Sequence, residues 1–217
     1  MASSSSVGIR PNTALQGGNT AQAATVRGVR TQITAWVMVI GGLCGLAAAF
    51  VLTIEKIQLA ADPTHIPSCS INPVLSCGSV MSSPQASVFG FPNSLLGLIG
   101  FAIVMTCGAV AAGGVLGRWI WVGLQVGLTG AIVFVHWLIY QSLYVIGALC
   151  PYCMVVWIVS AALFVVVTTR NLHAVGATRW RAGGLIARYA AVIVTGWTLA
   201  VTALIANRFW YYWTTLL

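Results

Sequence analysis

Residues 119–169 read WIWVGLQVGLTGAIVFVHWLIYQSLYVIGALCPYCMVVWIVSAALFVVVTT and contain no Lys, Arg, Asp or Glu. A helix that spans a membrane needs about 20 apolar residues, so this run is long enough for two spans. The tetrapeptide Cys150-Pro151-Tyr152-Cys153 lies where the second of these spans begins. A CxxC is a redox motif when one thiolate is stabilised and the partner sulfur is close enough to displace it. The run therefore predicts a redox pair that exchanges electrons with a molecule dissolved in lipid, which indicates a quinone.

The composition of the whole chain is that of an integral membrane protein. Of its 217 residues, 59% are hydrophobic and 6% are charged, whereas a soluble domain carries about 25% charged residues. Further uncharged windows cover 31–54, 63–117 and 189–207. The second is too long for one span, and its Pro- and Ser-rich first part is typical of a loop. We therefore expect an all-α membrane domain over 33–210, with an outer loop 59–93 and helices near 33–58, 94–115, 119–143, 150–170 and 187–208.

The ends of the chain and its basic residues predict how the domain is oriented. Residues 1–32 are rich in Ser, Gly, Thr and Ala, which predicts a disordered tail, and 211–217 form a short outer tail. With the N-terminus in the cytoplasm, the inner segments hold eight basic residues and the outer side holds only Lys56 and Arg208, as the positive-inside rule requires. The net charge of +8 then reflects membrane topology, and no nucleic-acid partner is expected.

Four of the six cysteines fall on the outer side of this predicted topology, where disulfides form and persist. The other two, Cys44 and Cys107, lie inside spans and are expected to be apolar filler. The four could form structural disulfides, a zinc site or a relay of two dithiol pairs. A zinc site with four cysteine ligands usually has two tight CxxC knuckles, and one pair here is too widely spaced. These four, which we take as a relay without a metal, are Cys69, Cys77, Cys150 and Cys153.

The relay has a physical basis in the predicted helix start. Pro151 suits the first helical position, and the free N–H groups of that turn favour a thiolate at Cys150. Cys153 lies one turn deeper on nearly the same face, nearer to the lipid and to a quinone. Cys69 and Cys77 lie in a Pro-rich loop that is expected to be mobile enough to shuttle a disulfide by thiolate exchange.

Three segments resemble the vitamin K epoxide reductase homologues of bacteria, of the actinobacterial kind without a fused thioredoxin domain. They are the run Cys77-Gly78-Ser79-Val80-Met81-Ser82-Ser83, the run Phe89-Gly90-Phe91-Pro92-Asn93-Ser94, and the CxxC. The resemblance covers roughly residues 35–170. The order of the cysteine pairs is the reverse of that in the disulfide-bond protein B family, which places its CxxC in the first outer loop.

This resemblance implies a four-helix bundle around a quinone pocket, with a fifth helix outside it, in the bacterial inner membrane. It implies that a periplasmic thioredoxin-fold disulfide oxidase delivers electrons to Cys69, and that Cys77 then attacks the Cys150–Cys153 disulfide at Cys150. Cys153 is left as the thiolate that reduces a membrane quinone of the menaquinone or ubiquinone class. Both cysteine pairs would lie on the outer face.

The resemblance also implies residues that line the quinone pocket. Ser83 and Asn93 match pocket residues of the family, and Asn93 can donate a hydrogen bond to a quinone oxygen. The segment from Ser82 to Asn93 would form a short half-helix that caps the pocket. The remaining candidate quinone contacts are Trp157, Tyr152, Phe89 and His136.

Several expectations rest on single residues in the spans. His136 is an ionisable residue within a span and hence a functional candidate, although a neutral His bonded to a neighbouring carbonyl is the other interpretation. Five glycines are expected to permit close helix approach: Gly41, Gly42, Gly45, Gly123 and Gly127. With only Glu55 and Asp62 as acids, quinone protonation is expected to use water or the thiol itself.

Two other functions stay open. Animal members of the family carry a Tyr where this chain has Trp157, and an indole donates one hydrogen bond but cannot act as a phenolic acid. This difference speaks against epoxide reduction, although a reductase of vitamin K or its epoxide would use the same cysteines. A non-enzymatic membrane protein with structural disulfides is the alternative of another class, and few ionisable residues lie deep in the spans to mark an ion path.

Overall fold

The computed structural model describes residues 13–114, 116–177 and 181–214, and within these ranges the regular structure is helical. Five of the described helices are long and apolar enough to cross a membrane. This confirms the predicted fold class, an all-α multi-pass membrane protein. The five spans are Thr31–Ala61, Asn93–Ala112, Arg118–Ile146, Pro151–Ala174 and Ala190–Arg208.

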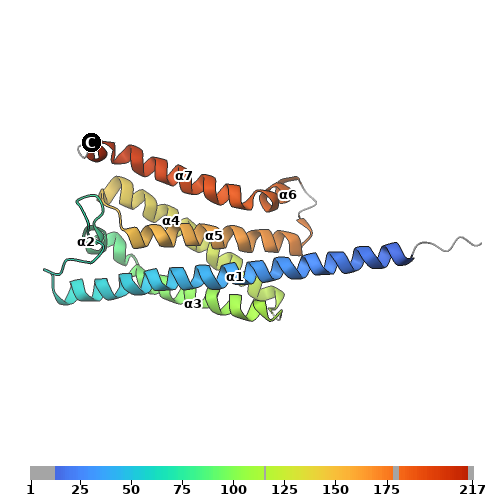
Figure 1. The fold of residues 1–217 in the computed structure, drawn as a ribbon. Coiled ribbons are helices and arrows are strands. Elements are labelled where there is room, and N and C mark those ends of the chain that lie inside the picture. The colour runs from blue at the N-terminus through green and yellow to red at the C-terminus, as the bar shows by residue number, and fades with distance from the viewer. Residues whose placement is uncertain (1–12, 115, 178–180, 215–217) are drawn as a thin grey trace, which may run out of the picture.

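The spans are joined by short helices and turns (Figure 1). The elements in chain order are α1 (Thr13–Ala61), α2 (Cys77–Ser82), the 3₁₀ turn η1 (Pro84–Ser87), α3 (Asn93–Ala112), α4 (Arg118–Tyr140), the π-helical turn η2 (Gln141–Ile146), α5 (Pro151–Ala174), α6 (Arg181–Arg188), α7 (Ala190–Arg208) and α8 (Trp210–Trp213). The predicted cap over the pocket is thus one turn, η1, between α2 and α3.

Helix α1 begins at Thr13, whereas the sequence predicted a disordered tail up to residue 32. The structure instead continues the helix through 13–32. Extending an existing helix adds one hydrogen bond for each residue fixed, so it needs no buried surface of its own. Several residues of this stretch, such as Ala, Gln, Leu and Arg, are good helix formers. Residues 1–12 lie outside the described residues.

Helices α1, α3, α4 and α5 form the bundle, and α7 lies outside it against α5 (Figure 1). Helix α3 packs along α1 at glycine positions of α1: a Cβ on Gly42 would lie 2.9 Å from the backbone N of Met105, and one on Gly45 would meet the ring of Phe101. Helix α4 packs along α5. The predicted four-helix bundle with a fifth helix outside is therefore confirmed.

All four relay cysteines lie at one end of the bundle, which we call the cysteine end; it holds α2, the end of α1 and the start of α5 (Figure 1). Lys56 and Arg208 lie at this end, where Arg208 Nε donates to the Leu143 carbonyl oxygen at 3.0 Å. Arg118 begins α4 and Arg170 lies near the end of α5, both at the opposite end. The two ends thus carry the basic residues that the sequence assigned to opposite sides of a membrane.

Candidate active site

The sulfurs of three cysteines from distant parts of the chain meet at the cysteine end. Cys69 and Cys77 are joined by a disulfide, and Sγ of Cys77 lies 3.1 Å from Sγ of Cys150. All three sulfurs lie within 4.8 Å of one another. Cys150 and Cys153 are free thiols. The loop pair is therefore oxidised, the CxxC pair is reduced, and one sulfur of each pair is in contact with the other.

Main-chain hydrogen bonds hold the two pairs in register. The N–H of Leu149 donates to the carbonyl oxygen of Val74 at 2.8 Å, and the N–H of Ser76 donates to that of Leu149 at 2.9 Å. These bonds make a short parallel bridge between residues 75 and 149. Cys150 directly follows Leu149, and Cys77 lies two residues after Leu75. The bridge thus sets the distance between the two sulfurs.

The segment that carries Cys69 is held closed by Glu55, a buried carboxylate near the end of α1. Glu55 accepts hydrogen bonds from the Ser68 N–H at 3.2 Å and from the Ser68 hydroxyl at 2.5 Å. Its other oxygen pairs with Nε2 of His65 at 2.9 Å. Cys69 and Cys77 are 5% and 0% exposed in this arrangement. The segment therefore covers the disulfide in this structure.

Cys150 has the surroundings of a reactive thiolate. It precedes the first residue of α5 with an extended backbone, and Pro151 takes the first helical position as predicted. The hydrogen bond from the Cys153 thiol lowers the pKa of the Cys150 thiol, the backbone N–H groups of Cys153 and Tyr152 act in the same direction, and burial opposes them. Cys150 thus combines contact with Cys77 and stabilisation of its charged form.

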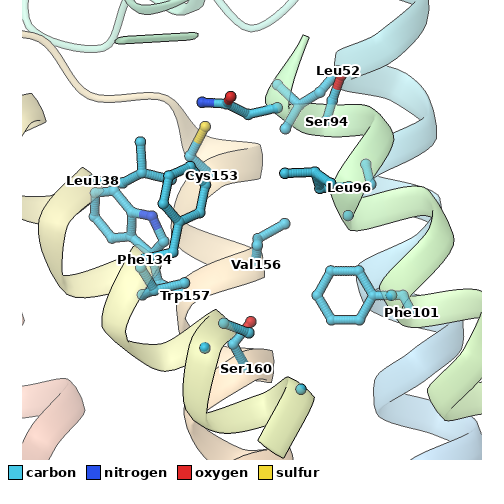
Figure 2. A pocket seen from close by; sticks show the side chains of 18 of the residues that line it. Leu52, Ser94, Leu96, Phe101, Phe134, Leu138, Cys153, Val156, Trp157 and Ser160 are labelled. Atoms are coloured by element: carbon cyan, nitrogen blue, oxygen red, sulfur yellow. The ribbon is translucent and has the colours of Figure 1, made fainter. Parts of the chain in front are cut away.

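A cavity of about 830 Å³ begins beside Cys153 and runs between α3, α4 and α5. Cys153, Val156, Trp157 and Ser160 follow one another along α5 and line one wall, opposite Leu96 and Phe101 of α3 (Figure 2). Their spacing of three or four residues puts them on one helix face. The lining is overwhelmingly apolar; most of its polar side chains lie near the cysteine end, and Ser160 lies about two turns further along α5. The cavity therefore leads from a thiol into the interior of the membrane domain.

Glycines open the cavity between α3 and α4. Gly100, Gly123, Gly127 and Gly130 line it, and a Cβ on any of them would meet no atom within 4 Å. The expectation of close helix approach is therefore wrong for Gly123 and Gly127, which face the cavity, and is confirmed for Gly41, Gly42 and Gly45 of α1. Phe89, which is 57% exposed, lines the same cavity.

Two predicted pocket residues, Ser83 and Asn93, lie at the cysteine end of the cavity. Asn93 Nδ2 donates to the Gln85 carbonyl oxygen at 2.7 Å, and its Oδ1 accepts from the Val88 N–H at 3.2 Å. One N–H of the amide is left for a ligand. The Ser83 hydroxyl donates to the Val80 carbonyl oxygen at 2.7 Å, so Ser83 can accept from a ligand but has no proton left to donate.

The other four candidates divide evenly. Trp157 and Phe89 line the cavity, whereas Tyr152 packs against the cysteine cluster and His136 lies elsewhere. His136 bonds the Ile132 carbonyl oxygen through Nδ1 at 2.7 Å, and the indole N–H of Trp197 donates to its Nε2 at 3.0 Å. The expectation that His136 contacts the pocket is therefore wrong. Its Nδ1 bonds a carbonyl oxygen within α4, and its Nε2 accepts a hydrogen bond from Trp197 of α7.

Two residues that sequence reasoning did not place in the site belong to it. Glu55 anchors the segment before Cys69, and Lys56 lines the cavity with its Nζ bonded to the Met81 carbonyl oxygen at 2.5 Å. One feature of the sequence could have identified them: Glu55 and Lys56 are adjacent charged residues within a membrane span, where a charge is costly and often functional.

The model of the vitamin K epoxide reductase family matches residues 36–168, which is more than half of the 217-residue chain. The matched range contains α3 and α4, residues 36–61 of α1, residues 151–168 of α5, the residues that line the cavity and all four relay cysteines. It ends before α7, the helix that packs outside the bundle.

Proposed function

The chain belongs to the vitamin K epoxide reductase family, and from this premise we propose that it couples disulfide formation to a membrane quinone. In this proposal it reoxidises a periplasmic thioredoxin-fold disulfide oxidase through Cys69 and Cys77, and passes the electrons through Cys150 and Cys153. The observation that carries the proposal is the 3.1 Å contact between the sulfurs of Cys77 and Cys150, with Cys153 in the wall of the cavity.

The exchange proceeds through mixed disulfides, each step breaking one S–S bond and forming one. A partner thiolate attacks Cys69 and releases Cys77; the partner's second thiol then frees Cys69, so that the partner leaves oxidised. Cys77 attacks Cys150 in the Cys150–Cys153 disulfide and releases Cys153 as a thiolate. Attack of Cys69 on Cys77 then breaks the Cys77–Cys150 bond, releases Cys150 as a thiolate and re-forms the loop disulfide. The two CxxC thiols are then reduced, which is the distribution of bonds in the structure.

The cavity fits a quinone with a long apolar tail. Its volume of about 830 Å³ lies in the usual range of small-molecule sites, about 300–1,000 Å³. Asn93 would hold a ring oxygen through its free N–H beside Cys153, and the glycine-lined part between α3 and α4 would take the tail. A bound quinone of the menaquinone or ubiquinone class supplies the acceptor for two electrons and two protons when Cys150 and Cys153 re-form their disulfide.

The proposed topology places the N-terminus in the cytoplasm and the cysteine end at the periplasmic face of a bacterial inner membrane. The distribution of basic residues supports this orientation, because Arg118 and Arg170 lie at the opposite end, where the positive-inside rule puts the cytoplasm. At the cysteine end, Ile66 and Ile71 are 77% and 70% exposed on either side of Cys69. They offer an apolar contact to a soluble partner.

Reduction of vitamin K or its epoxide is the alternative activity within the same family. Trp157 lines the cavity and is 3% exposed, so the side chain where animal members carry a Tyr faces the ligand space. An indole has no acidic O–H, which favours quinone over epoxide as the substrate. Supplying each oxidised substrate and following its reduction separates the two activities.

The test uses the full chain purified in detergent, with a reduced thioredoxin-fold oxidase as electron donor and decylubiquinone or menadione as acceptor. Quinone reduction should fall to the background rate in Cys150→Ala and in Cys153→Ala. Cys69→Ala should stop turnover with the protein donor but keep turnover with dithiothreitol, which reduces the CxxC pair directly. The matched control is Cys44→Ala, an exposed cysteine remote from the relay, which should keep the wild-type rate.

The outcomes separate the parts of the proposal. Wild-type rates in Cys150→Ala or Cys153→Ala would refute the relay. Turnover of the wild-type protein with the epoxide but not with either quinone would replace the proposed activity by the alternative one.

A further inference from the structure

Lys56 places a positive charge in a membrane span, and the sequence contains no second lysine. An ammonium near the end of a span usually extends its side chain to the interface with water. Here α2 covers the side chain: Nζ donates to the Met81 carbonyl oxygen at 2.5 Å, and the residue is half-buried. Lys56 is therefore held against the protein and does not need the lipid headgroups to satisfy it.

No carboxylate of the two acidic side chains neutralises this charge. Glu55, its neighbour in the chain, gives its oxygens to His65 and Ser68. Asp62 accepts from the N–H and the hydroxyl of Thr64. Since a charge in a membrane segment is costly unless it is paired or functional, the lysine needs another explanation.

The cavity supplies one, because Lys56 is the only charged residue among the described residues that line it. Leu52, one turn earlier on the same face of α1, also lines the cavity. Leu52 belongs to the same buried cluster as Cys77 and Cys150, and Cys153 packs against that cluster. The ammonium thus lies at the same end of the cavity as the Cys153 thiol.

The hydrogen-bonding capacity at this end also favours Lys56. An ammonium has three N–H donors, and one of them is used on Met81. Asn93 has one free N–H, and the Ser83 hydroxyl proton is given to Val80. Lys56 therefore has the most free donors of the three, and it alone carries a full positive charge.

On the premise of the proposed function, we infer that Lys56 binds and polarises the quinone oxygen on which negative charge develops as the CxxC pair is oxidised. The overall step converts two thiols and a quinone into the Cys150–Cys153 disulfide and a quinol, with two electrons and two protons transferred. A fixed donor aimed at a developing oxyanion lowers the barrier without reorganisation. Lys56 would therefore act on the quinone half of the cycle and leave sulfur exchange unaffected.

The first test compares Lys56→Met with Lys56→Arg in the full chain, with decylubiquinone as acceptor and dithiothreitol as donor. Loss of one such donor costs about 10²–10³-fold in kcat, so Lys56→Met should lose quinone reduction by about that factor. Lys56→Arg should keep most of the rate. As a measure of folding and of sulfur geometry, each change is also made in a Cys69→Ala/Cys153→Ala background. There the diamide-driven formation of the Cys77–Cys150 disulfide should be unchanged.

A second test detects contact between quinone and Lys56 without any turnover, by measuring how fast the Lys56 amine is modified. Since the sequence has one lysine, the modification of a side-chain amine reports on Lys56 alone. Reductive methylation of Lys56, followed by mass spectrometry of its peptide, is timed with and without decylubiquinone. At a quinone concentration of about ten times Kd, mass action predicts about tenfold slower modification. The α-amino group of the same chain is the internal control and should be modified at an unchanged rate.

The outcomes distinguish this inference from the proposed function. A wild-type protein that reduces decylubiquinone while Lys56→Met does so at the same rate would overturn the inference and leave the function standing. An equal loss in Lys56→Arg would assign the effect to shape and also overturn it. Failure of the wild-type protein to reduce either quinone would remove the function on which the inference rests.

Discussion

Replacing Glu55 with Ala should release the segment that carries Cys69. Glu55 is 7% exposed and accepts three hydrogen bonds, two from Ser68 and one from His65. Because Ser68 directly precedes Cys69, these bonds keep the segment that carries Cys69 in the position in which the Cys69–Cys77 disulfide is buried. Ala at position 55 removes all three acceptor interactions at once.

The size of the effect follows from these bonds. A hydrogen bond to a charged group contributes about 1.5–3 kcal/mol, but His65 is 31% exposed, and solvent replaces part of what is lost. Taking about 1 kcal/mol for each bond gives about 3 kcal/mol in total. Since 1.4 kcal/mol corresponds to a factor of ten, the open state of the segment should become about 100-fold more populated.

The assay is the rate at which a water-soluble phosphine reduces the Cys69–Cys77 disulfide. It is run in a Cys150→Ala/Cys153→Ala background, so that no internal thiol takes part, and the products are counted as maleimide adducts. If reduction requires opening, Glu55→Ala should accelerate it about 100-fold, in proportion to the open population. Glu55→Gln should give a smaller increase, because its amide oxygen still accepts a hydrogen bond.

The matched control is Asp62→Asn. Asp62 is the only other acid in the sequence, and its carboxylate bonds Thr64 alone among the residues that the structure describes, within an exposed turn. Its replacement should leave the reduction rate unchanged. An unchanged rate in Glu55→Ala, or an equal acceleration in Asp62→Asn, would refute the anchoring role of Glu55.

Gly108→Ala places a Cβ 2.8 Å from the Met38 Cβ and should lower the free energy of unfolding in micelles by about 1–3 kcal/mol. Gly127→Ala, whose Cβ meets nothing within 4 Å, should raise it by up to about 1 kcal/mol; equal losses would contradict the open cavity. Because the Cys153 thiol lowers the pKa of Cys150, Cys153→Ala should move the onset of Cys150 thiolate absorbance to higher pH. Cys153→Ser keeps a donor and should move it less, and equal onsets in all three proteins would contradict the hydrogen bond.

The membrane helices could be predicted from sequence because the physical signal is local. Length and hydropathy alone decide whether a segment can span lipid, so each predicted span overlaps an observed one. The start of α5 at Pro151 was predictable for the same reason, since proline is favoured in the first helical turn. The start of α1 could not be predicted in this way. A polar composition indicates that a segment is not buried, but it does not show whether an adjoining helix continues through it.

The contacts across the bundle were not predictable from local patterns. The bridge between Leu75 and Leu149 uses main-chain groups, which leave no trace in side-chain identity. The glycines at 123 and 127 have the same sequence signature whether they face a helix or a cavity. From the sequence, Lys56 counts only among the basic residues that set the membrane orientation, because the sequence does not reveal that α2 covers its side chain. His136 was ambiguous, and its partner Trp197 lies on a helix far along the chain.

The main-chain bridge also bears on which of the loop sulfurs would move in the proposed exchange. The bridge ties Leu75 to Leu149, which would keep Cys77, two residues later, beside Cys150 and leave Cys69 as the sulfur that moves. The five residues 70–74 separate Cys69 from Leu75, which makes six steps along the chain, and an extended chain spans at most about 3.3–3.6 Å for each step. If the turn formed by the bonds from Ile71 and Asn72 to Leu75 unfolds, Cys69 has a tether of roughly 20 Å. If the proposed function holds, that reach would let Cys69 meet the disulfide of a soluble partner away from the bundle, and the length of 70–74 would limit how far from the bundle the exchange can take place.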